Sequence, residues 1–125
     1  GAAPAALETV QGSGADVPAE IEKWVETLVP VIEDGLADGR VDPDREVGLV
    51  DQLVEYNVDR QVAFLLEDDA VPDSVSVFGL VYDFQAVYGS VPGRTYLVNA
   101  DGETDPAALR ERVPDAAAEQ VRRLL

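Results

Sequence analysis

The sequence predicts an α+β domain in which several helices pack on a β-hairpin. Segments 21–32 and 44–66 carry apolar residues at helical spacing, which is typical of amphipathic helices. Segments 75–84 and 94–99 are instead rich in β-branched and aromatic residues. A turn containing Gly and Pro separates them, so they predict two antiparallel strands. At 125 residues the chain is one domain or part of one.

The N-terminal region predicts two helices. The Ala-rich stretch Pro4–Val10 forms the first, and Gly12-Ser-Gly14 ends it. Asp16 is then expected to cap a second helix, with Pro18 in its first turn. The apolar stripe of this second helix comprises Ile21, Trp24, Val25, Leu28 and Ile32.

The second helix is expected to be interrupted, whereas the helix that follows it is expected to be continuous. Pro30 should kink or break the second helix near Leu28, because proline lacks the backbone N–H and clashes with the preceding turn. Gly35 and Gly39 should mark its end. The next helix is predicted without interruption from about Asp44 to Leu66. Trp24 and Phe64 are expected in the core. The stripe of the long helix comprises Val47, Val50, Leu53, Val54, Val58, Val62, Leu65 and Leu66.

The strand predicted at Val75–Phe84 is apolar on both faces, which suits a strand covered on both sides of a sheet. Arg94–Asn99 supplies one partner strand, and a two-stranded sheet is marginal by itself. We therefore expect another chain, or a preceding half of the domain, to complete the sheet.

Two further helices should follow the hairpin in the sequence, one from Asp105-Pro106 to about Val113 and one over Ala116–Leu125, capped by Asp115.

The charge balance narrows the class of partner. Twenty-five acidic residues face nine basic ones, giving a net charge of −16, and Lys23 is the single lysine. This pattern predicts a halophilic protein in a cytoplasm at molar salt, where repulsion is screened within a few ångströms. An acidic decoy for a basic partner and simple solubility remain as alternatives. Nucleic acid is excluded as a partner, because its phosphates need a basic stripe that the sequence lacks.

Features that the sequence lacks indicate the cellular compartment of the protein and limit the reactions that its side chains could catalyse. No apolar run approaches the roughly 20 residues of a membrane span, and no signal-peptide pattern is visible, so we expect a cytoplasmic protein without membrane contact. The chain has no cysteine and no histidine. Disulfides, thiolate nucleophiles, the usual zinc ligands and the commonest general base are therefore excluded.

Five segments follow one another in an informative order. The chain opens with Gly1-Ala-Ala-Pro-Ala-Ala-Leu7, and Trp24 lies in the next predicted helix. Asn57-Val-Asp-Arg-Gln-Val-Ala-Phe-Leu65 forms a later helix, and Val77-Phe-Gly-Leu-Val-Tyr-Asp83 a strand, with a return strand at Gly93–Val98. In this order and spacing the segments resemble the C-terminal half of the β-class carbonic anhydrases, after that family's His-x-x-Cys zinc motif.

The resemblance implies a fragment of an α/β fold over residues 1–100, with 101–125 as a helical C-terminal extension. It also implies a lyase, carbonate dehydratase, which uses zinc to interconvert CO2 and bicarbonate. The family's zinc ligands and its catalytic Asp-Arg dyad lie in His-x-x-Cys and Cys-x-Asp-x-Arg motifs. Neither motif occurs in this chain. We therefore expect no catalytic residue, no metal ligand, no cofactor and no activity from this chain alone.

Three functions remain open. In the first, the chain belongs to a carbonic anhydrase that meets CO2 and bicarbonate only when an N-terminal half is present. Alternatively, it is a metal-free paralogue that acts as a self-associating or regulatory protein, forming a homo-oligomer through strand or helix pairing. An unrelated acidic binding domain is the third reading. Tyr82 lies where some family members use a tyrosine at a bicarbonate site, and here it is interpreted as a packing residue.

Other constellations are interpreted as structural. The stretch Asp34–Arg45 resembles a calcium loop, but Leu36 stands where a ligand is needed and Arg45 where a bidentate Glu belongs, which favours a solvated turn. Gly12–Val17 lacks the third glycine of a dinucleotide fingerprint. The pairs Asp42/Asp44 and Asp68/Asp69 are attributed to helix capping and turns.

Overall fold

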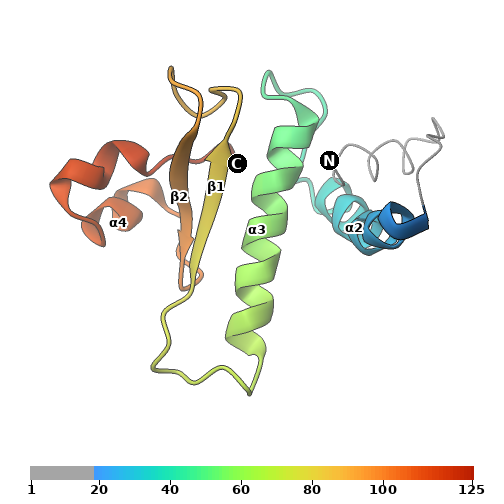
Figure 1. Ribbon diagram of the computed structural model, residues 1–125, viewed down its shortest axis with the longest axis horizontal. Coiled ribbons are helices and arrows are strands. Elements are labelled where there is room, and N and C mark those ends of the chain that lie inside the picture. The colour runs from blue at the N-terminus through green and yellow to red at the C-terminus, as the bar shows by residue number, and fades with distance from the viewer. Residues whose placement is uncertain (1–18) are drawn as a thin grey trace. The chain divides into compact units, whose positions relative to one another are not determined.

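The computed structural model describes residues 19–125, without the side chains of Glu20, Ile21, Trp24 and Val25. This part of the chain contains three α-helices, one 3-10 helix and a two-stranded antiparallel sheet, so the α+β class is confirmed (Figure 1). The helix predicted at Pro4–Val10 and the cap at Asp16 lie outside the described residues. In chain order the elements are α2 (Ala19–Ala37), α3 (Leu49–Glu67), β1 (Phe78–Asp83), β2 (Arg94–Ala100), α4 (Pro106–Glu111) and η1 (Asp115–Gln120).

The chain divides into two compact units, and the boundary falls inside α3. Among the described residues, the first unit comprises residues 19–56 and Leu125, and the second comprises Asn57–Leu124. In the first unit the buried residues Ile32, Val41, Leu53 and Tyr56 form the core, which Leu28 and Leu125 help to cover. This core joins α2 to the first half of α3.

Helix α2 runs through Pro30, so of the predicted kink or break near Leu28 the break does not occur. Leu28 and Ile32, on either side of the proline, pack in the same core, and this burial offsets the lost hydrogen bond. Gly35 is also inside the helix. A Cβ there would lie 3.0 Å from Val41 and 3.1 Å from the Tyr56 ring, so glycine permits close packing. Gly39, with φ of +75°, follows the helix end as predicted.

Helix α3 begins at Leu49, five residues later than predicted. The buried side chain of Gln52 explains the delay. Its amide nitrogen donates to the carbonyls of Asp42 and Val47, and its amide oxygen accepts from the Asp42 N–H. These bonds satisfy backbone groups of residues 42–47 in a turn. The same groups would otherwise have paired within the first turns of a longer helix. The stripe is buried at Leu53 and Val62, whereas Phe64 is 68% exposed, so its predicted core position is wrong.

The second unit is built on the predicted hairpin. Strand β1 pairs antiparallel with β2, with Leu80 opposite Leu97 and a bulge between Gly79 and Leu80. The strand is shorter than predicted. Val75 lies in a turn, where its N–H donates to the Pro72 carbonyl.

The C-terminal extension is only partly helical. Asp105 caps α4 as predicted, accepting a 3.1 Å hydrogen bond from the Ala108 N–H, but this helix ends at Glu111. The helix predicted over Ala116–Leu125 is wrong. A 3-10 turn ends at Gln120, and Val121 is extended and forms a parallel bridge with Leu97. Val121 is 1% exposed, and burying it against β2 outweighs one more helical turn.

Candidate interaction surface

Four large apolar side chains are exposed in a row, three on one face of β1 and the fourth on Phe84, directly after the strand. Phe78, Leu80, Tyr82 and Phe84 are 56%, 54%, 52% and 77% exposed, and we call these four residues the β1 face. The rings of Tyr82 and Phe84 contact each other edge to face, with centroids 4.6 Å apart. Tyr82, interpreted from the sequence as a packing residue, packs against Phe84 but remains 52% exposed. The strand was expected to be covered on both faces. Among the described residues only one face is covered, since exposed and buried residues alternate strictly along β1.

The opposite face of β1 is held tightly by α3. A Cβ on Gly79 would lie 2.6 Å from a methyl of Val58 and 3.2 Å from one of Val62. Only glycine permits this approach of helix to strand. Val58 also packs against the cluster formed by Val81, Tyr88, Tyr96 and Val98. The helix and strand segments that carried the family resemblance therefore meet at Gly79.

On the side of the hairpin that faces away from α3, α4 and the end of the chain pack on β2 but not on β1. Leu97 and Ala100 are buried with Leu109 and Val121. Their cross-strand partners Leu80 and Phe78 point to the same side and stay exposed. In the described part of the chain, β1 pairs with β2 alone. An open edge next to contiguous apolar side chains is a surface that proteins otherwise protect with lysine, proline or a covering element.

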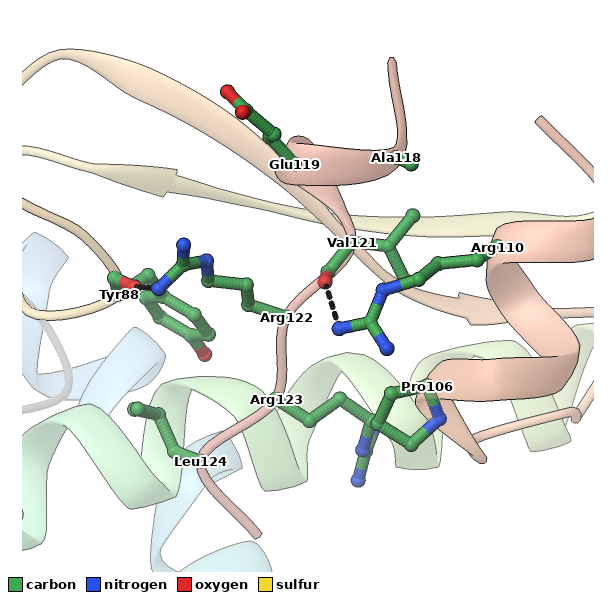
Figure 2. Close-up of a pocket in the computed structure, with 9 residues that line it drawn as sticks. All are labelled: Tyr88, Pro106, Arg110, Ala118, Glu119, Val121, Arg122, Arg123 and Leu124. Carbon is green, nitrogen blue, oxygen red and sulfur yellow. Dashed lines mark hydrogen bonds between the residues drawn. The ribbon is translucent and has the colours of Figure 1, made fainter. Parts of the chain in front are cut away.

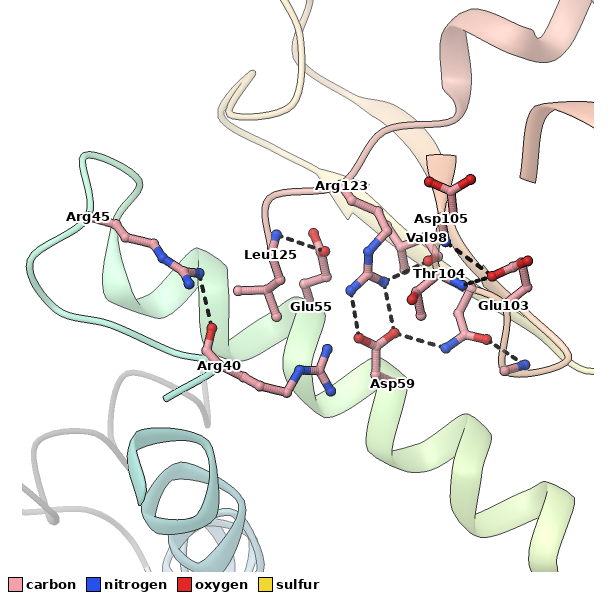
Figure 3. Close-up of polar contacts among 12 residues, drawn as sticks. Arg40, Arg45, Glu55, Asp59, Val98, Glu103, Thr104, Asp105, Arg123 and Leu125 are labelled. Carbon is pink, nitrogen blue, oxygen red and sulfur yellow. Dashed lines mark hydrogen bonds and ion pairs between the residues drawn. The ribbon is translucent and has the colours of Figure 1, made fainter. Parts of the chain in front are cut away.

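A buried polar cluster ties the C-terminal end to α3 and β2 (Figure 3). Arg123 contacts both carboxylate oxygens of Asp59, at 2.9 and 2.8 Å, and donates to the Val98 carbonyl at 2.7 Å. Asn99 donates to the same carboxylate at 2.9 Å. The Arg123 and Asp59 side chains are only 5% and 6% exposed. The bidentate geometry and the additional hydrogen bonds offset the cost of burying two charges.

Asp83, the last residue of the Val77–Asp83 motif, shapes the turn between the strands. Its carboxylate accepts hydrogen bonds from the N–H groups of Val87 and Tyr88, both at 2.9 Å. Its carbonyl accepts from the Gly93 N–H at 2.7 Å. Asp83 is 4% exposed, so its role is to close the hairpin.

The acidic candidates of the sequence serve local structure. In the calcium-like stretch, Asp38 accepts from the Tyr56 hydroxyl and from the Arg40 N–H, and Asp42 accepts from the Asp44 N–H. Asp68 accepts from the Ala70 N–H in the same manner. No group of three or more His, Cys, Asp or Glu side chains within the described residues could hold a metal ion. The stretch Gly12–Val17 lies outside the described residues.

Sequence reasoning missed the Asp59–Arg123 pair, because 64 residues separate its members and each belongs to an ordinary surface type. None of the helices found among residues 19–125 is long and apolar enough to cross a membrane. Comparison with models of protein families, with curated proteins and with solved structures finds no match for this chain.

Proposed function

We propose that this chain is a scaffold whose sheet is completed by a further polypeptide segment. The observation that carries the proposal is the β1 face beside the open edge of β1. An added strand would pair its backbone with β1, and the cover that comes with it would bury the four exposed side chains. Complete burial of a fully exposed side chain of this size contributes roughly 1.5–3 kcal/mol, and these partly exposed side chains would gain a part of it.

We further propose that the completed domain is of the β-carbonic anhydrase type and interconverts CO2 and bicarbonate. Support comes from the two motif segments, Asn57–Leu65 and Val77–Asp83, which belong to consecutive elements and pack together at Gly79. The residues present do not fit a zinc site, because the chain contains neither cysteine nor histidine. The added segment would therefore supply the chemistry, and this chain would hold the sheet. The net charge of −16 favours a cytoplasm at molar salt as the location.

A second candidate is a metal-free protein that associates with itself or regulates a partner. The open edge of β1 favours it, because two copies could pair these edges around a two-fold axis. In that arrangement the β1 faces of both copies would form one continuous apolar surface.

Zinc content and CO2 hydration of this chain, purified in molar KCl, test the first candidate. We expect neither zinc nor activity from the chain alone. The coding region before the Gly1 codon should encode Cys-x-Asp-x-Arg and His-x-x-Cys, and the longer protein should be active. Zinc and activity in the chain alone, or an upstream region without these motifs, would contradict the proposal.

Light scattering in the same buffer separates the second candidate. A dimer that the substitution Leu80→Glu converts to monomer would favour self-association. Val91→Glu is the matched control, because Val91 is 45% exposed but lies in the turn, off the β1 face. In the longer protein, Leu80→Glu should lower stability and Val91→Glu should not.

A further inference from the structure

Basic residues are concentrated at the C-terminal end of this acidic chain. Residues 105–125 contain four of the nine basic residues and four of the twenty-five acidic ones. This segment is therefore neutral, and residues 1–104 carry the whole net charge of −16. All four basic residues are arginines, which bind oxyanions better than lysine does because their planar fork donates two parallel hydrogen bonds.

Three of the four arginines line one cavity of about 500 Å³ within the second unit (Figure 2). This volume lies in the range of small-molecule sites. Arg110 comes from α4, and Arg122 and Arg123 come from the extended end of the chain. The remaining wall includes the apolar side chains of Pro106, Val121 and Leu124.

The three guanidinium groups are used differently. Arg123 is neutralised by Asp59, as described above. Arg110 instead donates to the Val121 carbonyl, and Arg122 to the Tyr88 carbonyl, each at 3.2 Å. A backbone carbonyl orients the side chain but does not cancel its charge, and a guanidinium has five N–H donors. By contrast Arg112, outside the cavity, pairs with Asp101 at 3.0 Å.

The acidic side chain at the cavity does not neutralise these two arginines. Glu119 belongs to the lining, but Figure 2 shows its carboxylate pointing away from both Arg110 and Arg122. Two oriented cationic groups beside an apolar wall would attract an anion to this place, on a molecule whose charge repels anions elsewhere.

We propose that this cavity binds a small molecule whose phosphate or carboxylate groups are held by Arg110 and by Arg122 at separate places on its wall. The apolar wall would contact the uncharged part of the ligand. The site shares no residue with the β1 face, so it stands whether or not the sheet is completed by another segment.

Nuclear magnetic resonance titration of the full chain in molar KCl tests this site. Inorganic phosphate and succinate are the two probes, added separately, and chloride competes equally with both. We expect saturable shifts of the amide signals around Arg110 and Val121–Leu124 with at least one probe. Response to phosphate alone, to succinate alone or to both would assign the oxyanion class. Saturable shifts with neither probe would overturn the proposal.

Substitutions then assign the binding to the two arginines. Arg110→Gln and Arg122→Gln should each weaken affinity roughly tenfold or more, since a charge-assisted hydrogen bond contributes about 1.5–3 kcal/mol. Arg94→Gln is the matched control, an exposed arginine on β2 outside the cavity, and should change affinity less than about twofold. Equal losses in all three variants would show a general charge effect and overturn the proposal. Should a glutamine variant not fold, Arg110→Lys and Arg122→Lys keep the aliphatic stem and should still bind more weakly.

Discussion

The two strands of the hairpin are similarly apolar, yet they are buried very differently. In β2 every residue from Tyr96 to Ala100 is buried, whereas in β1 exposed and buried residues alternate. One face of β2 packs with Val58 of α3, and the other lies under Leu109 and Val121. Strand β1 also packs with Val58 of α3 on one face, but no described element lies over its other face. Burial of the two strands is therefore decided by the elements that pack on them. The exposed apolar side chains of β1 remain available for association.

The largest expected effect comes from the polar cluster that holds the end of the chain against β2. Asp59→Ala would leave the buried Arg123 without its carboxylate partner. Removing one member of a buried ion pair costs about 3–5 kcal/mol. Urea unfolding in molar KCl would measure this loss of free energy of unfolding. Asp69→Ala, at an exposed loop position, is the control and should change stability by about 0.5 kcal/mol or less. Equal costs for both variants would mean that the cluster does not anchor the tail.

The cross-strand pair Leu80 and Leu97 tests the comparison of the strands directly. Leu97 is 8% exposed and Leu80 is 54% exposed, although they face each other in the register. Leu97→Ala should cost about 2–5 kcal/mol through the cavity it leaves. Leu80→Ala should cost about 1 kcal/mol or less in the isolated chain. A large loss for Leu80→Ala, appearing only in an associated species, would identify the β1 face as an interface.

The tight approach of α3 to β1 predicts an intermediate effect. Gly79→Ala introduces a methyl 2.6 Å from Val58, so helix and strand must separate slightly. Overpacking of this kind costs about 1–3 kcal/mol. Thermal unfolding of the single variant and of Gly79→Ala combined with Val58→Ala would check the cause, since the second change removes the obstructing methyls. A double variant no more stable than the sum of both losses would rule out this contact as the reason.

The smallest effect concerns the entry to β1. The Val77 N–H, which donates to Asp101 at 2.7 Å, lowers the pKa of that carboxyl; partial burial opposes this, and Arg112 adds to the lowering. Because the pKa is lower in the folded state, this contribution to stability is present above about pH 4 and is lost as pH falls through the folded-state pKa. Asp101→Asn tolerates the φ of +52° at this position. The difference in melting temperature from the unsubstituted chain should be largest near neutral pH and should close in acid. A difference that is constant with pH would contradict this origin.

Much of the hairpin could be predicted, because its determinants are local. The β-branched and aromatic residues of both strands and the turn chemistry between them indicated the pairing, and Asp105 indicated the start of α4. The end of the chain could not be predicted in the same way. Its helical pattern is real, but Val121 gains more by burial beside Leu97 than by another helical turn. The arginine cavity was also missed, although the concentration of arginines after residue 105 was a readable signal.

The fold class, the order of most elements, the acidic character of the chain and the absence of thiol and imidazole chemistry could all be read from the amino-acid sequence. These properties depend on composition and on short-range periodicity. Tertiary structure alone decided which apolar side chains are covered, that Asp59 meets Arg123, and that Arg110 and Arg122 share a cavity. Such outcomes depend on contacts between residues far apart in the chain, and a local pattern of side chains does not specify its distant partner.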